Sequence, residues 1–157
     1  LINNNEKYIL PTLKSRCLTF KIYLTFDQSM NVSNQLLNAN LFDLINHDLI
    51  SYYNTPGEII NLFNFSKDKS LDLRDYTLIN FLNLLIDNGY YKKNKLVKNL
   101  LVNFIELFFL KEYRLNSSRK SLIKIYQNFV AKIYNTEKFN LDEESVFLEF
   151  KSKLLNG

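Results

Sequence analysis

The chain has 157 residues, of which 46% are hydrophobic and 15% aromatic; this is enough to fill a core and excludes an intrinsically disordered protein. One cysteine and one histidine cannot form an internal disulfide or complete a zinc site, so no metal centre is expected and a reducing cytoplasm suits the chain. The formal net charge of +4 is compatible with a nucleic-acid-binding assembly, and no apolar run is long enough to cross a membrane.

The first 25 residues are predicted to form short β-strands around one short helix. Residues 18–24 alternate apolar and polar side chains at the period of a strand, and residues 1–5 are a shorter β-prone stretch. Between them, Pro11 excludes the centre of a strand and fits the first turn of a short helix. We expect that helix to end at Arg16.

Residues 26–66 have the periodicity of helices. One helix is predicted over 26–37, a second over 41–53, and a third from Pro56 to about residue 66. The second helix would place Leu41, Ile45, Leu49 and Tyr52 on one face. Thr55 and Glu58 have the spacing of a capping box, with Pro56 at the first helical position. The polar stretch 66–75 is the predicted linker to the next group of helices.

Residues 75–157 are predicted to form a bundle of four helices, which makes the fold class mainly α. The first helix ends at Asn88 and Gly89, and the second, over 95–114, is apolar on nearly every side and should be central. Ser117 or Ser118 caps the third helix, and the fourth begins between Asn140 and Glu143. The residues expected to face inward are Leu78, Phe81, Leu82, Leu85, Leu122, Tyr126, Phe129, Val130, Ile133, Phe147, Phe150 and Leu154.

The most distinctive stretch of the chain is ILPTLKSRC, residues 9–17. It resembles a motif of bacterial clamp-loader subunits, which are relatives of the AAA+ ATPases, and Ser15, Arg16 and Cys17 match their Ser-Arg-Cys signature. The Leu-Pro-Thr before the signature is most similar to the delta-prime type. The resemblance implies that residues 1–25 end an AAA+ ATPase-like domain, that 26–66 form a helical lid and that 75–157 form a helical collar domain.

The same resemblance assigns roles to residues of this motif. It implies that Arg16 is an arginine finger that acts in trans on ATP and Mg²⁺ in a neighbouring gamma/tau subunit. Such a finger stabilises charge on the transferred phosphoryl group through its planar fork of donors. Pro11, Thr12, Ser15 and Cys17 would support it, Ser15 as a local hydrogen-bonding residue and Cys17 as a small buried apolar one. The alternative for Arg16 is a surface arginine that pairs with a nearby carboxylate.

Two features argue against an ATPase in this chain. The sequence contains no G-x-x-x-x-G-K-[ST] loop, so it has no autonomous active site and binds no cofactor alone. Active clamp-loader ATPases carry an arginine at the start of a lid helix. The place in this chain that resembles that position has Glu58 instead. The implied function is therefore that of a non-catalytic clamp-loader subunit within a DNA-directed DNA polymerase III holoenzyme. Its implied partners are the gamma/tau and delta subunits, and through them the sliding clamp and primed DNA, with no membrane contact.

Two alternatives remain open. The chain could be the C-terminal part of the ATP-hydrolysing gamma/tau subunit, or a helical protein-interaction module unrelated to replication. Because residue 1 is leucine, we expect the chain to be part of a longer protein.

A second candidate site lies at residues 90–98, where tyrosines and lysines mix. Lys92, Lys93 and Lys95 are candidate phosphate contacts, and the alternative is a solvated start of a helix. His47 has no neighbouring arrangement that would make it a catalytic base, so a surface position is expected.

Overall fold

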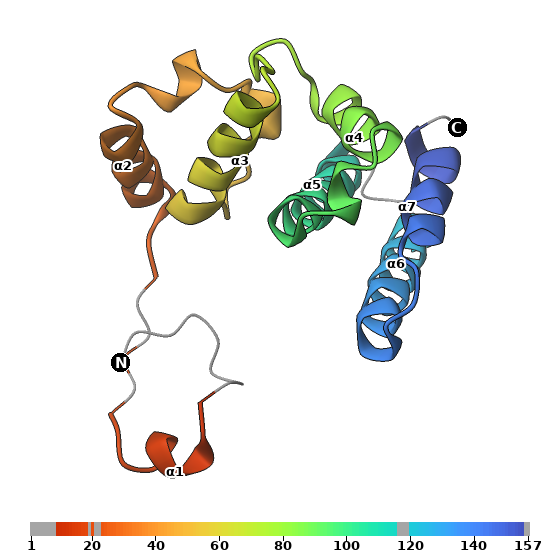
Figure 1. Ribbon diagram of the computed structural model, residues 1–157, viewed down its shortest axis with the longest axis horizontal. Coiled ribbons are helices and arrows are strands. Elements are labelled where there is room, and N and C mark those ends of the chain that lie inside the picture. The colour runs from red at the N-terminus through yellow and green to blue at the C-terminus, as the bar shows by residue number, and fades with distance from the viewer. Residues whose placement is uncertain (1–8, 19, 21–22, 116–119, 156–157) are drawn as a thin grey trace.

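The computed structural model describes residues 9–18, 20, 23–115 and 120–155 (Figure 1). These residues contain seven α-helices and no strand, so the predicted mainly α fold class is confirmed for them. We call residues 9–18, 20, 23 and 24 the N-terminal segment, which contains α1 (Pro11–Lys14), and residues 26–115 with 120–155 the helical body. Figure 1 shows α1 well apart from the helical body. None of the described helices is long and apolar enough to span a bilayer.

The first part of the helical body contains α2 (Phe26–Leu37) and α3 (Pro56–Asp68), which pack against each other. The bounds of α2 are those predicted. The predicted capping box at the start of α3 is confirmed, because Thr55 Oγ1 accepts from the N–H of Glu58 while Glu58 accepts from the N–H of Thr55. Thr25 and Gln28 form a second capping box at the start of α2.

Residues 41–53 do not form the predicted helix. Two 3₁₀ turns stand in its place, η2 (Leu41–Asp43) and η3 (His47–Leu49). The side chains of Asn40 and Asn46 each accept a hydrogen bond from the backbone two residues ahead, and such local bonds compete with helical ones. The N–H of Asn46 donates to the carbonyl of Leu73 at 3.1 Å, outside any helix. Leu41, Ile45 and Leu49 are buried as predicted, whereas Tyr52 is exposed.

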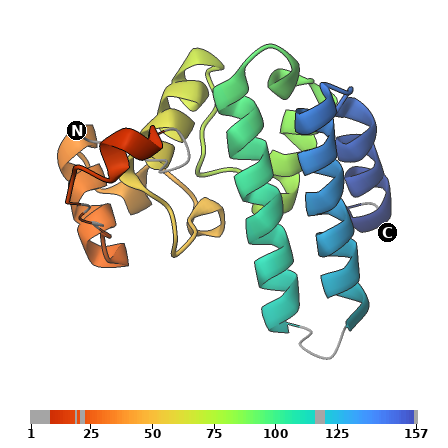
Figure 2. The ribbon, with the colours of Figure 1, turned by 90° about the horizontal axis from the view of Figure 1, so that it is seen from below.

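The second part of the helical body is a bundle of four helices, as predicted. Its centre is α5 (Lys95–Leu115), which contacts α3, α4 (Leu78–Asp87) and α6 (Lys120–Phe139). Figure 2 shows α5 and α6 side by side and antiparallel. α7 (Glu144–Phe150) packs on α6 and continues into a π-helical turn, η5 (Lys151–Leu155), that contacts α4. As predicted, α4 ends at Asn88 and Gly89, where Gly89 has a φ of 60° that favours glycine.

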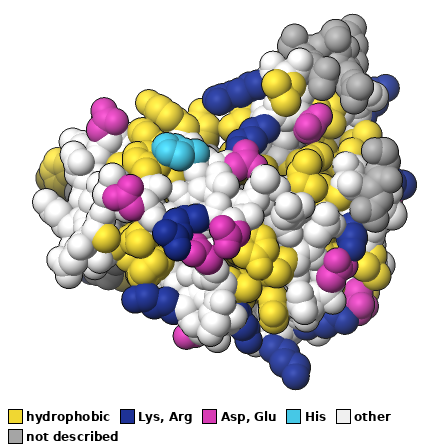
Figure 3. Space-filling model, turned by 90° about the horizontal axis from the view of Figure 1, so that it is seen from above, with side chains coloured by type: hydrophobic (Ala, Val, Ile, Leu, Met, Phe, Trp, Pro, Cys, Tyr) yellow, Lys and Arg dark blue, Asp and Glu magenta, His cyan; other side chains and the backbone are white. Residues whose placement is uncertain are grey.

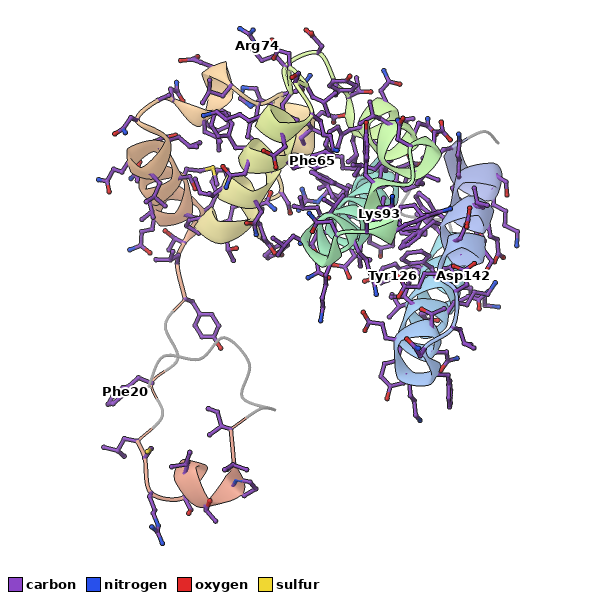
Figure 4. All side chains as sticks on the ribbon, in the orientation of Figure 1. Phe20, Phe65, Arg74, Lys93, Tyr126 and Asp142 are labelled. Atoms are coloured by element: carbon purple, nitrogen blue, oxygen red, sulfur yellow. The ribbon has the colours of Figure 1, made fainter. Side chains whose placement is uncertain are left out.

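One continuous hydrophobic core joins the two parts of the body. Aromatic side chains link them, because the ring of Phe65 in α3 meets Phe81 in α4 edge-on and Phe81 meets Phe104 in α5 in the same way. Figure 4 shows Phe65 among the side chains between α3 and the bundle. Leu73 is 2% exposed although it lies in the polar stretch predicted as a linker, so this stretch also contributes to the core.

Polar contacts reinforce the junction between the two parts. Asp48 in η3 accepts from the N–H of Leu78 at 2.6 Å and forms an ion pair with Lys111. Asn103 in α5 donates from Nδ2 to Glu58 Oε1 at 3.0 Å. The helical body is therefore tied across its middle by both burial and hydrogen bonds.

Several other predictions differ from the structure or fall outside it. Leu18, Phe20, Tyr23 and Leu24 do not form the predicted strand; a strand needs a neighbour for its backbone donors and acceptors, and the described residues provide none. Val130 was predicted to face inward but is 41% exposed, because it lies about 100° around α6 from the buried Phe129. The β-prone residues 1–5 and the cap at Ser117 or Ser118 lie outside the described residues.

Candidate arginine-finger segment

α1 is a single helical turn that ends at Lys14, two residues before Arg16, where the sequence predicted its end. Pro11 occupies the first turn, where its lack of an N–H costs no hydrogen bond. The N–H of Ser15 donates to the carbonyl of Pro11 at 3.0 Å, and the N–H of Arg16 donates to that of Leu13 at 3.1 Å. The Ser15 hydroxyl donates to the carbonyl of Thr12 at 3.1 Å, which confirms the predicted local hydrogen bond near the helix end.

Arg16 and Cys17 are both exposed. The described contacts include no hydrogen bond or ion pair of the Arg16 side chain, so its guanidinium has no carboxylate partner among them. Cys17 was expected to be buried, and this is wrong: the N-terminal segment does not pack on the hydrophobic core, so nothing covers the thiol within the described structure.

The apolar side chains of the N-terminal segment are also exposed. Phe20 is 82% exposed and is seen away from the helical body in Figure 4. The other large apolar residues of this segment that are exposed are Leu10, Leu13, Leu18, Tyr23 and Leu24. Several exposed large apolar side chains within one short segment are typical of a surface that another protein covers. Arg16 therefore lies on a segment whose own chemistry favours a protein contact.

The Glu58 side chain, at the start of α3, is turned toward α5. Its two carboxylate oxygens are occupied, one by the capping bond to the N–H of Thr55 at 2.9 Å and the other by Asn103 at 3.0 Å. The predicted capping role is confirmed, and the second bond was not predicted. The side chain is thus a structural acceptor between α3 and α5.

The second candidate site, at residues 90–98, contains side chains that are already engaged. Tyr91 is buried against Phe147, and burial raises the pKa of its hydroxyl. Lys92 pairs with Glu144 at 2.8 Å. Lys98 forms ion pairs with Glu143 and with Glu137.

These contacts leave Lys93 and Lys95 as the exposed lysines of the second site that have no ion pair among the described contacts. Most of the aromatic and basic character of this stretch thus serves the fold. The phosphate-contact role of Lys92, Lys93 and Lys95 stays a prediction.

His47 is exposed, as expected, and its ring stacks on Phe42 with centroids 4.4 Å apart. Figure 3 shows His47 at the surface, on a face where side chains of both charges are interspersed. In the part of the chain that the structure describes, no three His, Cys, Asp or Glu side chains gather as metal ligands.

Sequence reasoning missed a groove between α5 and α6. It has a volume of about 220 Å³ and is lined by Glu106, Phe109, Leu110, Tyr113, Leu122, Ile123 and Tyr126. The signal was available, because Glu106, Leu110 and Tyr113 follow one face of a helix at spacings of four and three residues. It was hidden because α5 is apolar around most of its circumference, so no single face stood out.

No family model, no curated protein and no solved structure matches the chain. Interpretation of function therefore depends on the motif around Arg16 and on the arrangement described above.

Proposed function

We propose that this chain is part of a delta-prime-type clamp-loader subunit and donates Arg16 in trans to the ATP site of a neighbouring gamma/tau subunit. The observation that carries the proposal is an exposed arginine, without a described intramolecular partner, at the end of a proline-led turn in an ILPTLKSRC motif. A helical group and a four-helix bundle follow that motif, in the order the resemblance implies. In this role the subunit helps to load the sliding clamp onto primed DNA without hydrolysing ATP itself.

The chemistry requires a cation whose backbone is held in place but whose side chain is not engaged in an ion pair within its own domain. An arginine finger contributes about 10³- to 10⁵-fold to phosphoryl transfer by stabilising negative charge in the transition state. The bonds from Ser15 and Arg16 back into α1 fix the backbone that carries the side chain. The exposed apolar residues around Arg16 supply a surface that can be buried in an assembly.

The position of Glu58 favours the delta-prime type over gamma/tau. A cation at the start of the lid helix would stabilise bound phosphate, whereas a carboxylate would repel it. Both oxygens of Glu58 are committed to the cap of α3 and to Asn103. The resulting contact is structural, which suits a subunit that binds no nucleotide of its own.

The test is ATP hydrolysis by the loader assembled from the full-length protein and its partner ATPase subunits. Arg16→Ala should lower DNA- and clamp-stimulated hydrolysis by about tenfold or more, and Arg16→Lys should not restore it, because a lysine lacks the planar fork. Arg74→Ala, which removes another exposed arginine, is the matched control and should have no effect. Unchanged hydrolysis with Arg16→Ala would remove the finger, and failure to assemble with ATPase subunits would favour an unrelated interaction module.

A further inference from the structure

The groove between α5 and α6 is the largest apolar depression among those described. Its floor and walls are built from α5 residues Leu110 and Tyr113 and α6 residues Leu122, Ile123 and Tyr126. In Figure 2 the last turns of α5 and the first turns of α6 extend beyond the neighbouring helices, side by side. Tyr113 and Ile123 are more than a third exposed, so the apolar walls are open to solvent.

The size of the groove suits large side chains. A cavity of about 150 Å³ in a protein core accepts a benzene ring. The volume here is about 220 Å³, enough for one aromatic or large aliphatic side chain with room for part of a second. Two antiparallel helices with an apolar groove between them are a common receptor for an amphipathic helix, which inserts side chains at spacings of three and four residues.

One charged group lies in this apolar groove. The Glu106 carboxylate reaches solvent, yet the protein around it desolvates it in part, and this together with the charge of Glu58 raises its pKa. The described contacts include no cation that pairs with it. A Lys or Arg of a binding partner could therefore form an ion pair with the Glu106 carboxylate, which has no cation partner among the described contacts.

The same charge argues against self-association through this groove. A two-fold dimer uses the same patch on both copies, so it would bring one Glu106 close to the other. Like charges set opposite each other across an interface are unfavourable. The occupant that complements the groove is therefore apolar and basic, and it is a different polypeptide.

We propose that the α5–α6 groove is a docking site for an amphipathic helix of a partner protein, which fills the groove with large apolar side chains and places a Lys or Arg against Glu106. This inference does not depend on the clamp-loader role or on Arg16. It assigns a second contact surface, which is carried by α5 and α6 and not by the N-terminal segment.

The experiment uses two designed helical peptides of about 18 residues, identical except for one position. Both carry Leu and Phe at helical spacings along one face; one has a Lys in the middle of that face and the other a Glu. Binding to the full chain is measured by fluorescence anisotropy. We expect the Lys peptide to bind about tenfold more tightly than the Glu peptide, and Glu106→Lys to reverse that preference.

Apolar substitutions separate groove binding from adhesion to any exposed apolar residue. Ile123→Asp should weaken the Lys peptide about tenfold, whereas Leu36→Asp, at an exposed leucine of α2, should leave it unchanged. Circular dichroism confirms that each variant is folded. Binding of neither peptide, equal binding of both, or insensitivity to Ile123→Asp would overturn the proposal. So would a dimer of the chain that Ile123→Asp dissociates, because it would show that the groove is occupied by a second copy.

Discussion

The N-terminal segment and the helical body are both rich in large apolar side chains, yet they bury them to opposite extents. Phe20 is 82% exposed, whereas Phe81 in α4 is 1% exposed. The difference does not come from residue type. It comes from whether a second apolar surface lies opposite, since burial removes apolar area from water only when two surfaces meet.

The helices of the two regions also differ in how much tertiary packing they have. α1 is four residues long and is held by backbone bonds within its own turn and by the Ser15 hydroxyl. The helices of the body are long enough to present apolar stripes to one another, and α5 contacts three other helices. Tertiary packing supplies most of the stability of a helix, so a single turn without such packing depends on what covers it.

The largest expected effect tests this comparison directly. Phe81→Ala should lower the free energy of unfolding by about 3–5 kcal/mol, because it opens a cavity beside Phe65 and Phe104 in the middle of the core. Phe20→Ala removes the same side chain from an exposed position and should change it by less than about 0.5 kcal/mol. Urea denaturation of the isolated chain measures both. A comparable cost for Phe20→Ala would mean that the N-terminal segment packs on the body in solution.

The comparison also explains which parts of the fold could be predicted from the sequence. Helices α2 to α7 were predicted because their apolar stripes, and caps such as Thr55 and Glu58 at the start of α3, lie within or next to the elements themselves. The helix predicted over 41–53 was wrong. The spacing of its apolar residues fits a helix, but the side chains of Asn40 and Asn46 close local turns instead. The burial of Cys17 was wrong because it depended on a partner surface, which a local pattern does not contain.

For the candidate sites too, local features could be predicted from the sequence, whereas features that depend on tertiary packing could not. The short proline-led helix before Arg16 and the local hydrogen bond of Ser15 were both predicted. The spacing of Glu106, Leu110 and Tyr113 was visible in the sequence, but it did not locate the groove, because that requires knowing which faces of α5 and α6 remain uncovered after packing. The sequence also did not reveal that Tyr91 would be buried and that Lys92 would pair with Glu144.

A smaller effect concerns the two capping boxes, one next to the N-terminal segment and one inside the body. Glu58→Ala should cost about 1–2 kcal/mol, because it removes the acceptor of the Thr55 N–H in the capping box of α3 and also the acceptor of Asn103. Gln28→Ala removes the acceptor of the Thr25 N–H in the capping box of α2, which has no such additional contact among the described bonds, and should cost about 0.5 kcal/mol. Glu58→Gln should retain most of the stability, since glutamine can also complete a capping box.

The distinction is measured with a double-mutant cycle that combines Glu58→Ala with Asn103→Ala. Coupling between these two sites should exceed coupling between Gln28→Ala and Asn103→Ala, which are not in contact. If Glu58→Ala and Gln28→Ala cost the same and show no coupling to Asn103, the bond between α3 and α5 does not help to join the two parts of the body.

The smallest expected effect is the pH dependence of the ion pair that joins η3 to α5. Burial alone would raise the pKa of Asp48, but the N–H of Leu78 and the ammonium of Lys111 outweigh it, so the pKa lies below its ordinary value of 3.8. A carboxyl with a lowered pKa in the folded state stabilises the protein above its unfolded pKa, and this contribution is lost as pH falls through the folded value. Asp48→Asn can keep an acceptor for Leu78 but removes the charge.

We therefore expect Asp48→Asn to be less stable than the parent chain by less than about 1 kcal/mol at pH 7, because the pair is partly exposed to solvent. The gap should stay constant down to about pH 4 and close below it, as Asp48 becomes protonated in the parent chain. Asp43→Asn, at an exposed acid in η2 for which no ion pair is described, is the matched control and should leave the stability at pH 7 unchanged. A gap that widens on acidification would reverse the sign of this contribution, and would mean that burial, not Lys111 and Leu78, sets the charge of Asp48.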